Sequence, residues 1–115
     1  MNLQNWKAQL RKGLLDLCVV NFLQRREYYG YDLVQDLKQI NGLRMREGNI
    51  YPILARLEED GLVTSQVRPS NSGPPRKYFR ITKTGEELLQ EMNEHWEEME
   101  LAVKSARKAN KGGKR

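Results

Sequence analysis

The stretches GNIYPILARLEEDGLV at residues 48–63 and GPPRKYFRIT at residues 73–82 decide the fold. In the first, isoleucine and leucine recur three and four residues apart, which gives a helix one apolar face for a core. Gly61 then ends the helix, because glycine readily adopts the left-handed conformation that closes one. Two β-prone runs flank residues 68–75, a segment of turn-forming residues. The order helix, strand, basic loop and strand predicts a winged helix.

Two further segments with helical periodicity come before this unit. Residues 6–25 predict a first helix whose apolar face is expected to be largely buried. That face comprises Leu10, Leu14, Leu17, Cys18 and Phe22. Residues 31–40 predict a second helix, which ends at Asn41 and Gly42, and residues 47–60 contain the third. The three helices and the hairpin follow the order of a winged helix-turn-helix domain.

The predicted fold class is therefore mainly α (α+β), in three segments. A winged helix-turn-helix domain with a two-stranded wing occupies residues 1–83. A long C-terminal helix, expected to mediate dimerisation, occupies residues 84–108. Residues 109–115 are rich in lysine and glycine and are expected to form a disordered basic tail.

The size and composition of the chain limit what it can be. Its 115 residues make one small domain whose core is marginal alone, so a partner subunit is expected. The single cysteine, Cys18, lies in an apolar run and excludes an internal disulfide or a thiolate metal cluster. No apolar run approaches the roughly 18 residues that span a bilayer, and the N-terminus lacks a signal-peptide pattern. We expect a cytoplasmic protein without a membrane partner.

The net charge of +5 is unevenly distributed along the chain. Residues 1–83 carry 14 basic and 8 acidic side chains, residues 84–103 carry seven glutamates and no Lys or Arg, and residues 104–115 carry six Lys or Arg and no acid. A basic winged helix suits a polyphosphate, because phosphates neutralised by Lys and Arg release their counterions. Double-stranded DNA is the predicted partner. The basic tail either adds affinity for DNA or keeps the chain soluble.

The long C-terminal helix carries a seam of apolar side chains spaced alternately three and four residues apart. The seam comprises Leu89, Met92, Trp96, Met99, Val103 and Ala106. The helix is roughly 35 Å long at about 1.5 Å per residue, more than so small a domain can cover. We expect it to pack on the same helix or the first helix of a second subunit, although packing within one subunit is the alternative. The predicted interface comprises Trp6, Leu10, Leu89, Met92, Trp96, Met99 and Val103.

Three motifs occur in a fixed order along the chain. They are Tyr-Gly-Tyr-Asp-Leu at residues 29–33, Gly-x-x-Tyr-Pro-x-Leu-x-Arg-Leu-Glu-x-x-Gly-Leu at residues 48–62, and Arg-Lys-Tyr-Phe-Arg-Ile-Thr at residues 76–82. In these motifs the chain resembles the PadR family of bacterial transcriptional regulators, over roughly residues 10–90. The resemblance implies a homodimeric winged helix-turn-helix repressor, often one relieved by a small molecule, which is associated with the nucleoid when bound to DNA.

The third helix supplies the residues expected to contact bases. In a helix-turn-helix, the N-terminal residues of the recognition helix enter the major groove. Here they are Glu47, Gly48, Asn49 and Tyr51. Gly48 permits a close approach to the duplex, and Asn49 can form two hydrogen bonds with adenine. Tyr51 can donate to a phosphate or contact a thymine methyl group.

Basic residues on either side of that helix are expected to contact phosphates or base edges. They are Arg44 and Arg46 before the helix, and Arg76 and Lys77 in the wing. In a wing, such residues can reach phosphates or the minor groove. Gly73, Pro74 and Pro75 replace the Gly-rich and Arg-rich wing tip that the family often shows, and the two prolines stiffen the entry to the hairpin.

Tyrosines near the second helix complete the expected DNA surface. Tyr29 and Tyr31 can contact the DNA backbone through their hydroxyl groups, and one of the two is expected to belong to the core. Arg56 has two open interpretations, which are a contact with DNA or an ion pair with Glu59 or Asp60.

Trp96 is the candidate sensor of a small molecule. Two such side chains facing each other in a dimer can sandwich a flat aromatic effector, with Met92 and Met99 as adaptable neighbours. Some members of the PadR family are similar in binding flat drugs between subunits. The alternative is that Trp96 only anchors the interface.

The sequence gives no support for catalysis, a cofactor or a metal site. His95 is the only histidine, and it is distant in sequence from Cys18. No glycine-rich phosphate loop precedes a helix. An enzyme is therefore not expected. The alternative to a DNA-binding regulator is a winged-helix module that binds another protein through its third helix and wing, although the basic residues of that surface argue against it.

Overall fold

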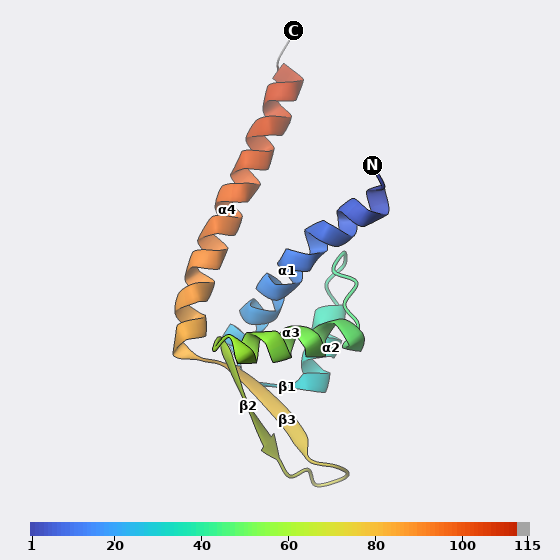
Figure 1. Cartoon of the computed structure of the whole chain (residues 1–115), viewed down its shortest axis with the longest axis vertical. Coiled ribbons are helices and arrows are strands. Elements are labelled where there is room, and N and C mark those ends of the chain that lie inside the picture. The colour runs from blue at the N-terminus through green and yellow to red at the C-terminus, as the bar shows by residue number, and fades with distance from the viewer. Residues whose placement is uncertain (113–115) are drawn as a thin grey trace.

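The computed structural model describes residues 1–112, which form four helices and three strands. In chain order they are α1 (Leu3–Arg25), β1 (Tyr28–Tyr29), α2 (Gly30–Lys38), α3 (Glu47–Glu59), β2 (Val63–Arg68), β3 (Arg76–Ile81) and α4 (Lys83–Gly112). The helices α2 and α3 pack with the sheet into a small body, from which the β2–β3 hairpin projects (Figure 1). The helices α1 and α4 leave the other side of the body and diverge. The predicted winged helix-turn-helix fold is confirmed.

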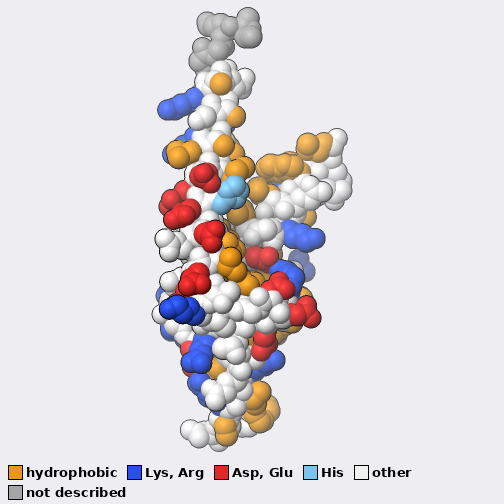
Figure 2. Space-filling model, turned by 60° about the vertical axis from the view of Figure 1, so that its left-hand side comes forward, with side chains coloured by type: hydrophobic (Ala, Val, Ile, Leu, Met, Phe, Trp, Pro, Cys, Tyr) orange, Lys and Arg blue, Asp and Glu red, His pale blue; other side chains and the backbone are white. Residues whose placement is uncertain are grey.

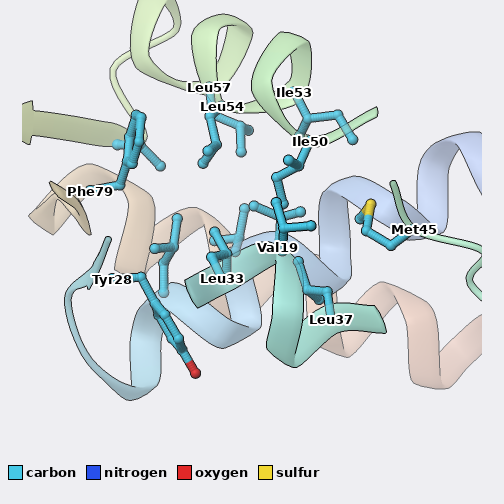
Figure 3. Close-up of a cluster of buried hydrophobic side chains, with 14 of the residues drawn as sticks. Val19, Tyr28, Leu33, Leu37, Met45, Ile50, Ile53, Leu54, Leu57 and Phe79 are labelled. Atoms are coloured by element: carbon cyan, nitrogen blue, oxygen red, sulfur yellow. The ribbon is translucent and has the colours of Figure 1, made fainter. Parts of the chain in front are cut away.

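The core lies where α3 faces α2 and β3. The apolar face predicted for α3 is buried, with each of its four side chains at most 8% exposed. Those side chains are Ile50, Ile53, Leu54 and Leu57. They point toward Leu33 and Leu37 of α2, with Phe79 of β3 beside them (Figure 3). Phe79 is thus the aromatic residue of the wing that enters the core.

The core tyrosine is neither of the two that the sequence indicated. Tyr28 is fully buried, whereas Tyr29 is half-buried and Tyr31 is exposed. The Tyr28 hydroxyl leaves the apolar cluster and donates to the Asp36 carboxylate over 2.7 Å, and the Arg26 guanidinium lies over its ring. The expectation that Tyr29 or Tyr31 fills the core is therefore wrong, because strand alternation turns Tyr28 inward.

The sheet has three antiparallel strands in the order β1-β3-β2, one more than the predicted two-stranded wing. The wing itself is the β2–β3 hairpin, whose register runs from Val63 opposite Ile81 to Arg68 opposite Arg76. The additional strand, β1, pairs with the inner part of β3. A strand of two residues is too short for its alternation to be detected in a sequence pattern.

The first helix is buried only in its C-terminal half. Its fully buried residues are Val19, Val20 and Leu23, and Asn2 caps its N-terminus by accepting a hydrogen bond from the Asn5 N–H. Leu10 is 48% exposed, so the prediction of a largely buried helix is wrong for the N-terminal half. That half extends beyond the small body (Figure 1), and residues 3–10 are exposed apart from the half-buried Lys7.

The fourth helix is longer than predicted, and its first turns contribute to the core. It starts at Lys83 and runs to Gly112, so residues 109–112 are helical where a disordered tail was expected; residues 113–115 of that tail lie outside the described part of the chain. Leu89 is 1% exposed and fills the core of its own subunit, which corrects its place in the predicted dimer interface. Beyond it, the side-chain amides of Asn21 and Asn93 exchange two hydrogen bonds and join α4 to α1. No helix of the described chain is long and apolar enough to cross a membrane.

Candidate nucleic-acid interface

The helix α3, predicted to be the recognition helix, begins with a hydrogen bond that one of its candidate base-contacting residues accepts. The Asn49 side-chain oxygen accepts from the Arg46 backbone N–H over 3.2 Å, which satisfies a donor at the helix start. That oxygen has a second lone pair and the amide nitrogen has two N–H groups, so Asn49 can still bind an adenine edge. Both Asn49 and Arg46 are exposed.

Two residues leave the backbone of α3 open to an approaching duplex. A Cβ atom on Gly48 would meet no atom within 4 Å, so this glycine is not required by packing in the free protein. One turn later, Pro52 has no N–H to donate to the Gly48 carbonyl group. Glu47 at the first helical position favours helix formation, since a negative charge stabilises a helix N-terminus.

Tyr51 connects α3 to the start of α2. A Cβ atom on Gly30 would lie 3.0 Å from the Tyr51 ring, so the absence of a side chain at Gly30 lets that ring lie close to the backbone of α2. Burial raises the pKa of Tyr51, and the negative charge of Glu47 raises it further. The Tyr51 hydroxyl therefore keeps its proton at neutral pH and is available as a hydrogen-bond donor.

An aromatic cluster continues this surface from α2 onto the wing. The ring centroids of Tyr29 and Tyr78 are 5.8 Å apart, and those of Tyr29 and Tyr31 are 6.2 Å apart. The Arg76 guanidinium lies 4.7 Å from the centroid of the Tyr29 ring. The structure thus brings together Tyr29, Tyr31 and Arg76, which the sequence indicated separately.

Arg68 at the end of β2 pairs with Glu27, which lies between α1 and β1, and the sequence indicated neither residue. Two nitrogens of the Arg68 guanidinium donate to the two carboxylate oxygens of Glu27, over 2.8 and 2.7 Å. This pairing lowers the pKa of Glu27, because hydrogen bonds and a positive charge favour the carboxylate. Arg68 lies opposite Arg76 in the hairpin, so its pairing with Glu27 reduces the repulsion between two facing cations. Its partner is 41 residues away in sequence, beyond any local signal.

Lys77 and Arg56 have different surroundings. Lys77 is exposed, and its ammonium group lies 5.6 Å from the centroid of the Phe79 ring. Arg56 donates to Asp16 of α1 over 2.6 Å, so the predicted partners Glu59 and Asp60 are wrong while a structural role is supported. This pair fixes α3 against α1 and leaves Arg56 less available to DNA.

The predicted ligand residues lie on a groove between α1 and α4. This groove has a volume of about 470 Å³, and Trp96, Met92 and Met99 line one side of it. Leu14 and Leu17 of α1 line the other side. Hydrophobic side chains follow the space between the two helices, while acidic side chains lie on the outer edge of α4 (Figure 2). His95, at the rim, contacts Glu98 at 3.2 Å.

Comparison with known proteins agrees with this arrangement. Residues 19–91 match the transcriptional regulator PadR-like family. The chain belongs to the PadR family. A PadR-like transcription factor from Bacteroides fragilis is 38% identical, with a TM-score of 0.75 over 89% of this chain and 98% of its own. A PadR family regulator from Eggerthella lenta is 33% identical, with a TM-score of 0.79 over 90% of each chain.

A curated relative supports the same conclusion. The transcriptional regulator Rv3488 of Mycobacterium tuberculosis is 32% identical over 83% of this chain and 87% of its own. Membership of the family makes this chain a DNA-binding transcriptional regulator and not an enzyme. Among the residues that the structure describes, no group of three or more His, Cys, Asp and Glu side chains could hold a metal ion.

Proposed function

We propose that this PadR-family regulator is a homodimeric repressor that binds a pseudo-palindromic operator and is relieved by a flat apolar ligand at the dimer interface. The observation that carries the DNA-binding part is the continuous surface formed by the start of α3, Tyr51, the tyrosine cluster and Arg76. The protein would act in the bacterial cytoplasm, on the nucleoid. It needs no cofactor for this role.

The homodimer is supported by apolar surface that one subunit cannot cover. Four side chains on the predicted interface faces of α1 and α4 are each at least 44% exposed. They are Trp6, Leu10, Met99 and Val103. A second copy would cover them by packing its own α1 and α4 against these faces. Two recognition helices would then lie roughly 34 Å apart, one DNA turn.

The Gly48→Ala variant is expected to change DNA binding and stability in opposite directions. Alanine is the better helix former, and nothing in the free protein contacts its added methyl group, so stability should rise by about 0.5 kcal/mol. Affinity for the operator should fall by about tenfold, because the methyl group obstructs close approach of the duplex. Fluorescence anisotropy with the intergenic DNA upstream of the gene measures the affinity, and thermal unfolding measures the stability.

Scrambled DNA of the same length is the control for specificity. The wild-type protein should prefer the upstream fragment by about a hundredfold or more. Equal, salt-dependent binding to both fragments would contradict a specific regulator. Absence of any binding would favour the protein-interaction alternative. If wild-type binding is specific and Gly48→Ala binds equally well, the duplex does not approach this glycine.

The effector part of the proposal rests on the groove that Trp96 lines. A dimer would bring two such grooves together, and a flat apolar molecule could stack between the two Trp96 side chains. The ligand would favour a dimer in which the recognition helices have a different spacing from the one that fits the operator. Operator affinity would then fall by a factor equal to the ligand's preference for that dimer over the operator-binding one. The alternative is that Trp96 only anchors the interface.

The neutral dye N-phenyl-1-naphthylamine tests the effector proposal. The chain has two tryptophans, so Trp6→Phe leaves Trp96 as the sole emitter. The dye should quench this emission saturably and lower operator affinity in the same concentration range. Trp96→Phe, which keeps Trp6, is the matched control and should bind the dye about tenfold more weakly. A dye that binds at Trp96 without changing operator affinity would argue for an anchor rather than a sensor.

A further inference from the structure

A hollow beside the start of the recognition helix is lined by four cations. Two come from the turn before α3, Arg44 and Arg46, and two come from α1, Arg11 and Lys12. Asn49 lines the same hollow, which has a volume of about 430 Å³. We name it the α1–α3 hollow. In this hollow α1, which was not predicted to contact DNA, lies next to Asn49, a candidate base-contacting residue.

The four cations of the α1–α3 hollow have no carboxylate partner within the described chain. The Lys and Arg ion pairs of the described residues use Arg26, Arg56 and Arg68 instead. The acid nearest on α1, Asp16, is already hydrogen-bonded to Arg56. Four positive charges gathered without an acid repel one another, which is a cost to the free protein that an anion would remove. The hollow is therefore complementary in charge to an anionic partner.

The turn that supplies two of these cations has an uncommon backbone. Arg44 has a φ of 53°, in the left-handed region that non-glycine residues seldom occupy. Its neighbour Met45 is 4% exposed and belongs to the core. Burial of Met45 thus accompanies the exposure of Arg44 and Arg46 on either side of it.

We propose that the α1–α3 hollow binds a DNA backbone phosphate next to the base pair that Asn49 contacts, so that Arg11 and Lys12 make α1 a third DNA-binding element. This inference rests on the proposed function and extends its DNA surface beyond α3 and the wing. Asn49 lines the hollow, so DNA that places a base edge against Asn49 also places the adjoining backbone beside the four cations. Phosphate contacts of this kind fix the register of a protein on the duplex and add affinity that salt weakens.

The double variant Arg11→Gln with Lys12→Gln tests this proposal. Operator affinity should fall by about tenfold, with a similar loss on scrambled DNA, because a phosphate contact is independent of sequence. The slope of log affinity against log salt should become shallower by about two in a dimer, since one phosphate is lost per subunit at about 0.9 each. Thermal unfolding verifies that the variant is folded.

Arg107→Gln with Lys108→Gln is the matched control. It removes the same charge from exposed positions on α4 that lie outside the predicted DNA surface, so its losses of affinity and of salt slope should be clearly smaller than those of the α1 variant. If both double variants lose affinity equally, the effect is one of general charge and the proposal is overturned. Unchanged affinity in the α1 variant also overturns it, whereas failure of the wild type to bind its operator would overturn the proposed function itself.

Ethylation interference with the wild-type protein gives a reading that needs no variant. One ethylated phosphate per half-site, next to the bases contacted by α3, should block binding, and the same modification should no longer matter to the α1 variant. Titration with inorganic phosphate distinguishes the source of the anion. Saturable phosphate binding that the α1 variant loses, together with unchanged operator binding by that variant, would assign the hollow to a small anion instead of DNA.

Discussion

Val103→Glu is expected to convert the protein from a dimer into monomers and to lower its operator affinity by about a hundredfold or more. Val103 lies on the predicted seam of α4 and is 55% exposed in one subunit, so a glutamate there costs the free subunit little. In a two-fold interface the substitution occurs twice, and burying each charge without a partner costs several kcal/mol. A monomer contacts one half-site and loses the gain from linked binding to the second.

Leu101→Glu is the matched control for this experiment. Leu101 lies two residues before Val103, on the opposite face of α4, and is 63% exposed. The Leu101→Glu substitution introduces the same charge on the same helix and should leave both the dimer and the operator affinity nearly unchanged. Analytical ultracentrifugation measures the oligomeric state, and fluorescence anisotropy measures the affinity. Dimers of Val103→Glu as stable as those of the wild type would exclude the α4 seam as the interface.

The parts of the fold that follow from local periodicity were predictable. The buried face of α3 and the strands of the wing are encoded within short stretches, because each residue of a helix or strand repeats its environment at a fixed spacing. The same holds for the apolar seam of α4. The pattern could not decide whether each seam residue packs within its own subunit or against a partner. Leu89, for example, is buried in its own subunit.

The contacts that join distant segments were not predictable. Arg56 pairs with Asp16 across 40 residues, and Arg68 pairs with Glu27 across 41. In the sequence, each arginine had either acidic residues closer by or a plausible role in binding DNA. Only the folded structure shows which acidic residue each arginine pairs with. The residues predicted to contact DNA at the start of α3 followed from the architecture, whereas the approach of Arg11 to Arg44 and Arg46 depends on how α1 crosses α3.

Gly85→Ala is expected to destabilise the protein by about 3 kcal/mol, although alanine normally favours a helix over glycine. A Cβ atom on Gly85 would collide with the Leu62 carbonyl oxygen and would lie 2.7 Å from Cγ1 of Ile81. Neither neighbour can move freely, since the Leu62 oxygen accepts the Thr82 N–H over 3.0 Å and Ile81 belongs to β3. The first turn of α4 would have to shift.

That shift would also break the hydrogen bonds that hold α4 to the body. The Thr82 hydroxyl donates to the Gly61 carbonyl over 2.7 Å and accepts from the Gly85 N–H over 3.0 Å. Gly48→Ala is the matched control, because it makes the same change at the start of another helix with no atom near the added methyl group, and it should raise stability. Thermal unfolding should therefore move in opposite directions for the two variants. A Gly85→Ala protein as stable as the wild type would mean that α4 can leave the body at more than one angle, so that the joint would not hold α4 rigidly to the recognition helix.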